Sequence, residues 1–209
     1  MIFTQEKRRS NGRALGVFVI VVGGILLFLW YIGIFGGNVH AVVPGKFYRS
    51  AELTGSNLNE VLDQDHIATE INLRGGDASK AWYRSEIDCC KAHGTRHFDI
   101  TLSARKLPPP DKLARLLSVL DTTPYPVLVH CQAGADRTGL VSTLYENVYQ
   151  HVPIDRAEED QLTWRHGHFS FGATHAMNDF FTLYRSTSNG MNLRDWILKR
   201  YPAVYKTAA

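Results

Sequence analysis

Residues 126–139 read Pro-Val-Leu-Val-His-Cys-Gln-Ala-Gly-Ala-Asp-Arg-Thr-Gly, and this stretch decides the fold and the site that we expect. The short apolar run 126–130 is typical of a strand buried in a parallel sheet. Cys131 follows it, and Arg137 precedes a predicted helix over 138–150. Backbone N–H groups of a loop that leads into a helix N-terminus bind anions. The stretch therefore predicts an anion site at the end of a strand.

The residue types in this loop suit a nucleophile that attacks phosphate. The converging N–H groups stabilise a thiolate on Cys131, whose thiol at its ordinary pKa of about 8.5 would be mostly protonated at neutral pH. The planar fork of Arg137 can bind two phosphate oxygens at once. The Thr138 hydroxyl can donate to the sulfur when it leaves. The predicted phosphate-binding residues are Gln132, Ala133, Gly134, Ala135 and Arg137, and we call residues 131–137 the phosphate loop.

Three further residues of the stretch have supporting roles. Gly134 allows the loop to turn without a Cβ clash, and Gly139 allows the following helix to pack closely. We expect His130 to be a buried hydrogen-bonding partner that shapes the loop. A second Cys-x5-Arg match, Cys90 to Arg96, lies at the end of a predicted helix with a strand after it, so its context does not fit.

The rest of the chain alternates between strand and helix patterns. This alternation predicts an α/β fold, with a central mostly parallel sheet flanked by helices. Ser79 is the expected N-cap of the first long helix, and Asp155 with Glu158 has the spacing of a capping box. The expected strands are 67–73, 96–102 and 126–130; the expected helices include 79–93, one after Pro108-Pro109-Pro110, 138–150, one from Asp155, 173–185 and 192–201.

The first forty residues differ from the remainder. Residues 1–13 are basic, and Ala14–Ile34 carries no charge. About 20 apolar residues cross a bilayer, so we expect a transmembrane signal anchor over 14–35, with residues 1–13 cytoplasmic. The remaining domain, 42–209, would then lie on the non-cytoplasmic, periplasmic or extracellular side. A cleaved signal peptide ending near Val39-His40-Ala41 is the alternative.

Composition excludes some functions. The formal net charge of +3 is concentrated in the N-terminal segment, so the remainder lacks the broad basic face of a nucleic-acid-binding protein. Three cysteines are too few for a disulfide framework, and their odd number would leave one unpaired.

On the residues His130 to Thr138, the sequence resembles the protein tyrosine phosphatase superfamily, whose signature is His-Cys-x5-Arg-Ser/Thr. It is most similar to the compact dual-specificity branch. The resemblance covers roughly Gly45 to Gln150 and includes Phe47-Tyr48-Arg49-Ser50 and Ile71-Asn72-Leu73-Arg74. It implies a cysteine phosphatase fold and a phosphocysteine mechanism that requires no metal and no cofactor.

One departure from this family concerns the general acid. The family normally places a carboxylate after the strand that corresponds to 96–102, and residues 102–108 contain none. Similar loops with the pattern Cys-x-x-Gly-x-Asp-Arg occur in the myotubularin lipid phosphatases and the secreted mycobacterial phosphatases, where the loop aspartate is taken as the acid. Asp136 is therefore the favoured acid. The alternative is that Asp136 only braces the loop. Asp99 and Asp111 are the other candidates.

The remaining polar residues give weaker signals. We expect His166 and His168 to form a surface pair at a helix end rather than a metal site. Glu158, Asp160 and Gln161 have the chemistry to position water, but a capped helix explains them equally well.

We therefore expect a phosphatase that hydrolyses phosphotyrosine, phosphoserine or phosphothreonine in proteins. A phosphoinositide or other inositol phosphatase is one alternative, and a catalytically silent phosphate-binding module is another. The expected partners are a phosphorylated protein or lipid and, through the N-terminal segment, a membrane.

Overall fold

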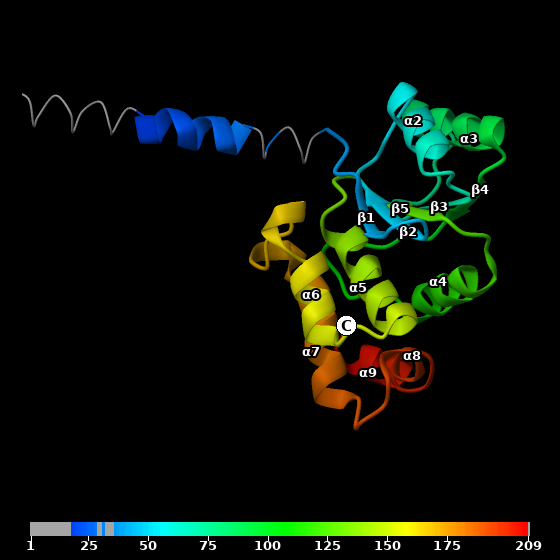
Figure 1. Cartoon of the computed structure of the whole chain (residues 1–209). Helices are drawn as coiled ribbons and strands as arrows, with labels where there is room; N and C mark the ends of the chain where they lie inside the picture. The colour runs from blue at the N-terminus through cyan, green and yellow to red at the C-terminus, as the bar shows by residue number, and fades with distance from the viewer. Residues whose placement is uncertain (1–17, 29–30, 32–35, 209) are drawn as a thin grey trace, which may run out of the picture. The chain divides into compact units, whose positions relative to one another are not determined.

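The computed structural model describes residues 18–28, 31 and 36–208 and divides the chain into two units, Met1–Gly36 and Gly37–Ala209 (Figure 1). In the first unit, residues 18–28 are helical. No helix within the described ranges is long and apolar enough to cross a membrane, so the expected transmembrane helix is not supported. Positions 1–17, 29–30 and 32–35 lie outside the described residues.

The second unit contains a five-stranded sheet with the order β1-β2-β5-β3-β4. β1 pairs with β2 antiparallel, and the other three pairings are parallel, as predicted. The analysis of the sequence did not predict β1 and β2, because neither has the apolar alternation of a strand. The strands are β1 (His40–Val43), β2 (Phe47–Ser50), β3 (Thr69–Asn72), β4 (Arg96–Asp99) and β5 (Val127–His130).

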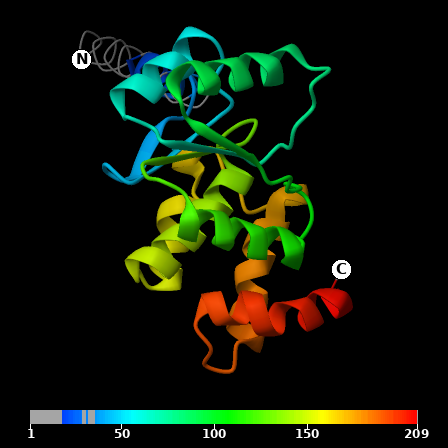
Figure 2. The same ribbon diagram turned by 90° about the vertical axis from the view of Figure 1, so that its right-hand side faces the viewer.

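Helices cover both faces of the sheet, which confirms the predicted α/β class. Figures 1 and 2 show α2 and α3 on one face and the other helices on the opposite face. The helices are α2 (Ser56–Gln64), α3 (Ala81–His93), α4 (Pro110–Thr122), α5 (Asp136–Gln150), α6 (Ile154–Gln161), α7 (Ala176–Thr187), α8 (Leu193–Asp195), a π-helical turn (Trp196–Arg200) and α9 (Tyr201–Ala208).

The parallel register gives the two faces different chemistry. Side chains alternate along a strand, so residues opposite one another in register lie on the same face. Val127 and Val129 pack into the main core with α4, α5 and the C-terminal helices, whereas Leu128 packs with α2 and α3. The register pairs Glu70 with both His97 and Leu128, and it pairs Asn72 with both Asp99 and His130. Polar residues of three strands therefore share the face that α3 covers.

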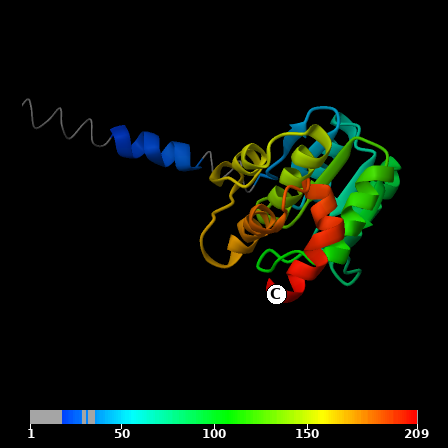
Figure 3. The same ribbon diagram turned by 90° about the horizontal axis from the view of Figure 1, so that it is seen from below.

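The C-terminal helices complete the main core. Trp196 and Tyr201 are fully buried, with ring centroids 4.8 Å apart, and the Tyr201 hydroxyl donates to the Pro108 carbonyl at 2.9 Å. Figure 3 shows this helical layer from below. The last third of the chain, where the family resemblance is weak, is therefore part of the same hydrophobic core.

Two predicted helix starts are wrong. Lys80 is the N-cap of α3, and Ser79 instead donates from its hydroxyl to Asp77 at 2.6 Å. Asp155 lies inside the first turn of α6, and its carboxylate accepts two hydrogen bonds from Arg185. In both cases a tertiary or turn partner competes more favourably for the side chain than the helix end does. The predicted C-terminal stop at Gly94 is confirmed, since Gly94 is left-handed with φ 68°.

Candidate active site

Cys131 lies directly after β5, the central strand between β2 and β3. The residue is buried, with 2% of its surface exposed. Two neighbouring loops border the phosphate loop here. The Glu52 N–H donates to the Gln132 carbonyl at 3.3 Å, and the Leu73 N–H donates to the His130 carbonyl at 2.9 Å. Cys131 therefore lies where the sequence predicts it, at the carboxyl end of a buried parallel strand.

The surroundings of Cys131 favour its thiolate. Burial opposes ionisation, but the charge of Arg137, the Thr138 hydroxyl and the backbone N–H groups of Thr138 and Ala133 outweigh burial and lower the pKa of Cys131. The buried Thr138 hydroxyl has no hydrogen-bond partner of regular geometry among the described residues, so its interaction with the sulfur has no competitor. A lowered pKa increases the fraction of thiolate, which is the form of cysteine that attacks as a nucleophile.

Gly134 meets a steric demand in the middle of the phosphate loop. Its φ is 67°, and a Cβ there would lie 2.6 Å from the Ala51 nitrogen and 2.7 Å from the Ser50 carbonyl carbon. No side chain fits between the loop and β2. Gly139 similarly allows α5 to approach the end of α6, because a Cβ there would lie 2.9 Å from the Gln161 carbonyl oxygen.

A fully buried arginine holds the phosphate loop from behind. Arg49, on β2, donates through Nη2 to the Gly134 carbonyl at 2.7 Å. Its Nη1 donates to the Gln161 side-chain oxygen at 2.7 Å and to the Gln161 carbonyl at 2.9 Å. Burial lowers the pKa of Arg49 to about 10, although the nearby Cys131 and Glu146 charges oppose this shift. Arg49 remains charged, and it links the loop to α6 through carbonyl oxygens.

Arg137 is aligned by the ends of two strands. Its Nη1 donates to the Leu73 carbonyl at 3.3 Å and to the Leu102 carbonyl at 3.4 Å. Its Nε is buried and has no partner within the described part of the chain. A guanidinium anchored through one nitrogen, with another donor unused, is suited to bind an oxyanion.

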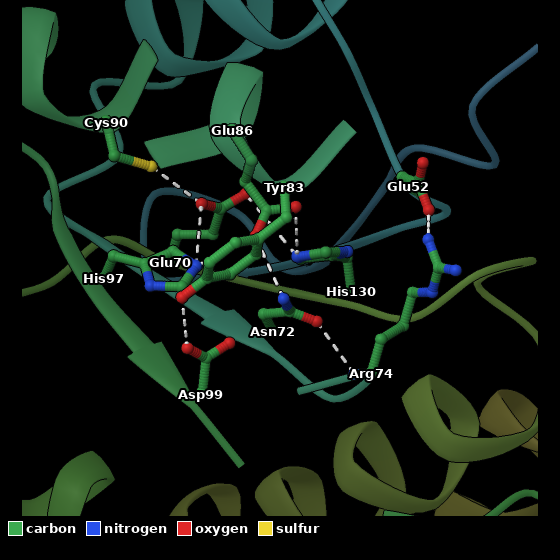
Figure 4. A network of polar contacts seen from close by, with 10 residues as sticks. All are labelled: Glu52, Glu70, Asn72, Arg74, Tyr83, Glu86, Cys90, His97, Asp99 and His130. Atoms are coloured by element: carbon green, nitrogen blue, oxygen red, sulfur yellow. Dashed lines mark hydrogen bonds and ion pairs between the residues drawn. The ribbon is translucent and has the colours of Figure 1, made fainter. Parts of the chain in front are cut away.

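A polar network lies beneath the loop, on the sheet face that α3 covers (Figure 4). His130 Nε2 is 3.3 Å from Glu86 Oε2 and 3.7 Å from Glu70 Oε1. His97 Nε2 is 2.9 Å from Glu86 Oε1, and Cys90 Sγ donates to Glu70 Oε2 at 2.7 Å. His130 is buried, as predicted, and its carboxylate partners, which could not be predicted from local sequence, come from β3 and α3.

The protonation states of this network follow from its contacts. Burial raises the pKa of Glu70. Burial would also raise that of Glu86, but hydrogen bonds from His130 and His97 outweigh it and lower the pKa of Glu86 to about 2. Burial opposes protonation of His130 and His97, yet the two glutamates outweigh it and raise both pKa values. These shifts favour an ionised Glu86 and protonated imidazoles, whereas burial favours a protonated Glu70.

The same network is where a metal ion would find ligands. Glu70, Glu86 and His130 offer ligand atoms that all lie within 4.8 Å of one another. Hydrogen-bond donors from His97, Asn72 and Cys90 already contact the two carboxylates. These donors occupy Glu86 Oε1 and Glu70 Oε2, whereas Glu86 Oε2 and the two ring nitrogens of His130 have no hydrogen-bond partner of regular geometry among the described residues.

The candidates for general acid have different surroundings. Asp99 accepts a hydrogen bond from the Tyr83 hydroxyl at 2.6 Å, within the network under the sheet (Figure 4). Asp111 is exposed in the first turn of α4, 3.9 Å from Lys112 Nζ. Asp136 adjoins Arg137 at the start of α5, and its side chain is 21% exposed. Of the three, Asp136 is the one that belongs to the phosphate loop.

Asp136 does not brace the loop through the backbone. Among the hydrogen bonds of the described residues, the partner of its carboxylate is His168, with Nδ1 2.7 Å from Oδ1. The expectation of an exposed His166–His168 pair is wrong, because His168 is 2% exposed and its ring turns inward. The reason is tertiary, since Asp136 and Asn178 supply hydrogen bonds to both ring nitrogens.

Two further contacts near the phosphate loop were missed from the sequence. Asn38, a buried residue before β1, donates to the Ala133 and His166 carbonyls, each at 3.0 Å. Arg74, just after β3, forms an ion pair with Glu52 and lies 3.9 Å from the centroid of the Trp82 ring. Burial lowers the pKa of Arg74, and the nearby charge of Arg137 lowers it further.

Comparison with known protein families identifies the family of this chain. A family model described as "Tyrosine phosphatase family" matches residues 33–155, more than half of the chain. This chain belongs to the tyrosine phosphatase family. It is thus a member of the protein tyrosine phosphatase superfamily, as the signature over His130–Thr138 suggested. No curated protein sequence matches it.

Solved structures show the same fold at low identity. The crystal structure of P. aeruginosa TpbA is similar with a TM-score of 0.52 and 21% identity, over 74% of this chain and 92% of that one. The catalytic domain of the PP-IP phosphatase SIW14 from S. cerevisiae gives a TM-score of 0.56 and 17% identity, over 75% and 94%. PTPMT1 gives a TM-score of 0.53 and 11% identity, over 72% and 99%. Family membership supports a cysteine phosphatase, that is, a phosphoric monoester hydrolase.

Proposed function

We propose that this protein hydrolyses phosphate monoesters through a phosphocysteine formed on Cys131. The observation that supports this most directly is the buried thiol of lowered pKa, which lies between an aligned arginine and converging loop N–H groups. Such an arrangement both activates a nucleophile and neutralises the charge of a phosphoryl group.

The reaction has two steps. In the first, the Cys131 thiolate attacks phosphorus, the S–P bond forms, and the ester P–O bond breaks as Asp136 gives a proton to the leaving oxygen. Arg137 and the loop N–H groups hold the three equatorial oxygens. In the second, water attacks phosphorus and returns a proton to Asp136, while the S–P bond breaks and the Thr138 hydroxyl stabilises the departing thiolate.

Cys131→Ser tests the nucleophile. We expect turnover of a phenyl phosphate to be abolished, with binding of the substrate retained. Cys90→Ser is the matched control, because Cys90 is also a buried thiol in a Cys-x5-Arg pattern but donates to Glu70. An active Cys131→Ser enzyme would contradict the mechanism, and a wild type that binds phosphate without turnover would indicate a silent binding module.

Asp136→Asn tests the acid. General acid catalysis contributes about 10²–10⁴-fold, and most with a poor leaving group. We expect a loss approaching this range with an alkyl phosphate and a much smaller loss with a nitrophenyl phosphate. Asp111→Asn, an exposed carboxylate outside the loop, is the control. An equal loss on both substrates would assign Asp136 a purely structural role.

For the substrate we propose phosphotyrosine, phosphoserine or phosphothreonine in proteins. One observation favours the inositol phosphate alternative, namely Arg74 as a second cation beside Arg137. Glu52 and Trp82 hold Arg74 in place, so a second phosphate near the scissile one would meet a preformed guanidinium. One structural neighbour, SIW14, is described as a PP-IP phosphatase, a name that indicates a substrate with more than one phosphate.

A panel of phosphopeptides and phosphoinositides compared on wild type and Arg74→Gln separates the two substrates. An inositol substrate would be assigned if the wild type prefers phosphoinositides and if Arg74→Gln loses activity on the phosphoinositides alone. Preference for peptides that is unaffected by Arg74→Gln would support a protein phosphatase.

For localisation we propose the topology that the basic residues 1–13 and the uncharged run Ala14–Ile34 favour, with the catalytic domain on the non-cytoplasmic side. An alkaline phosphatase fusion at the C-terminus should then be active in a bacterial host. Release of the catalytic domain into the soluble fraction would instead indicate a cleaved signal peptide.

A further inference from the structure

His168 is a nearly fully buried imidazole that the two-step mechanism above does not use. It lies in the segment between α6 and α7, more than thirty residues from the phosphate loop in sequence. Both ring nitrogens have partners. Nδ1 is 2.7 Å from Asp136 Oδ1, and Nε2 is 2.9 Å from Asn178 Oδ1. These two contacts determine where the ring carries its hydrogens.

The contact with Asn178 defines one of them. Asn178 Nδ2 donates to Glu158 Oε1 at 2.9 Å, and Arg185 Nη2 donates to Glu158 Oε2 at 2.5 Å. Because the Glu158 carboxylate only accepts, the nitrogen of the Asn178 amide faces Glu158 and its oxygen faces His168. The amide oxygen also only accepts, so His168 Nε2 carries a hydrogen. These residues join the facing helices α6 and α7 (Figure 3).

The second contact then requires one more proton. A neutral imidazole with its hydrogen on Nε2 has a bare Nδ1. A bare Nδ1 and an ionised Asp136 would be two acceptors at 2.7 Å, and they would repel. The contact is a hydrogen bond only when a proton lies between Nδ1 and Oδ1, either on an imidazolium or on a carboxyl.

We propose that His168 is the positioning residue of the general acid, an inference that rests on the proposed role of Asp136. His168 holds Oδ1 and leaves the other carboxyl oxygen directed to the leaving group. When that oxygen gives its proton to the leaving alkoxide or phenoxide, the pair keeps one proton between Nδ1 and Oδ1. The new carboxylate is thus stabilised without moving. In the second step, water returns the proton to the free oxygen of Asp136.

The test is a double-mutant cycle on Asp136 and His168, measured with an alkyl phosphate and a nitrophenyl phosphate. His168→Leu removes both hydrogen bonds, and His168→Asn keeps an N–H donor that can reach Oδ1. We expect His168→Leu to lower kcat on the alkyl phosphate by about 10–100-fold, within the range of general acid catalysis, with KM little changed and the nitrophenyl phosphate less affected. His168→Asn should restore part of the loss. In an Asp136→Asn background, substitution of His168 should cost nothing further.

His166→Gln is the matched control, since His166 lies in the same segment but packs against His40, with ring centroids 4.5 Å apart. It should retain activity on both substrates. Equal losses on both substrates from His168→Leu, or full additivity with Asp136→Asn, would overturn the proposal. If Asp136→Asn alone shows no dependence on the leaving group, the acid assignment itself fails, and this outcome is distinct.

A spectroscopic measurement tests the same pair without a destabilising variant. In the wild type and in Cys131→Ser, the shared proton should give a downfield imidazole resonance coupled to the His168 Nδ1 nitrogen. Asp136→Asn should remove this resonance. Its presence in Asp136→Asn, or its absence from the wild type at mildly acidic pH, would contradict the proposed hydrogen bond.

Discussion

Arg49→Met should both destabilise the protein and impair the phosphate loop. Arg49 is fully buried and makes three short hydrogen bonds, to the Gly134 carbonyl and to two oxygens of Gln161. Methionine fills a similar volume but leaves these acceptors without a donor. Hydrogen bonds to charged groups contribute about 1.5–3 kcal/mol each. The burial cost of a guanidinium, which the variant no longer bears, offsets part of their sum.

The expected net loss is about 3–5 kcal/mol, as for a buried charge-assisted network that loses one partner. For a domain of this size each kcal/mol lowers Tm by about 2–4 °C, so Tm should fall by about 6–20 °C. Thermal unfolding followed by circular dichroism measures this directly. Since the Arg49 charge also lies near Cys131, the variant should raise the pKa of the Cys131 thiol and slow its alkylation.

Two comparisons make the prediction specific. Arg49→Lys keeps the charge with fewer directed donors and should fall between wild type and Arg49→Met. Arg96→Met removes an exposed arginine from β4 of the same sheet and should leave Tm nearly unchanged. If Arg49→Met melts within about 2 °C of the wild type, a shift worth roughly 1 kcal/mol or less, Arg49 does not brace the loop and the reasoning is wrong.

Three other outcomes follow from the site. At slightly acidic pH iodoacetamide should modify Cys131 before Cys90, since burial and Glu70 raise the pKa of Cys90; Thr138→Ala should shift this reactivity to higher pH, and reaction first at Cys90 would contradict the assignment. The free energy of unfolding, measured with urea, should be higher for the wild type than for Glu86→Gln, and this difference should be largest at mildly acidic pH. It should decline as pH falls towards the lowered pKa of Glu86, about 2, and as pH rises through the raised pKa of His130; a difference constant with pH would refute this. Extensive treatment with a chelator should leave phosphatase activity unchanged, and activity restored only by added metal would assign the ion to the cluster of Glu70 and Glu86.

Local patterns determined much of this protein. The apolar run before Cys131 predicted the central strand, and the glycines and Arg137 predicted the loop and the helix after it. These features are local because a loop of seven residues supplies its own N–H groups, its nucleophile and its guanidinium. The helical periodicity of 110–122 and 136–150 likewise depends on residues three and four apart, which the sequence displays directly.

Strands β1 and β2 could not be predicted in the same way. Arg49 and Ser50 give β2 no alternation between apolar and polar residues, and all four of its residues are buried. Its identity as a strand depends on its pairing with β5, nearly eighty residues later in the chain. A buried arginine is unfavourable until Gly134 and Gln161 approach it, so its role exists only in the folded protein.

The partners of the proposed catalytic residues were decided by tertiary structure. His168 looked like an exposed residue because its neighbours Gly167, Phe169 and Ser170 follow neither a helical nor a strand pattern. Packing of α6 and α7 beside α5 brings it to Asp136 and turns a solvated side chain into a buried one. His130 meets its partners for a similar reason. The parallel register aligns Glu70 and His97 on its face of the sheet, and α3 brings Glu86 to that face. The proposed nucleophile and the proposed acid can be found from residues close in sequence. The side chains that position them, Arg49 and His168, come from segments that only folding brings together.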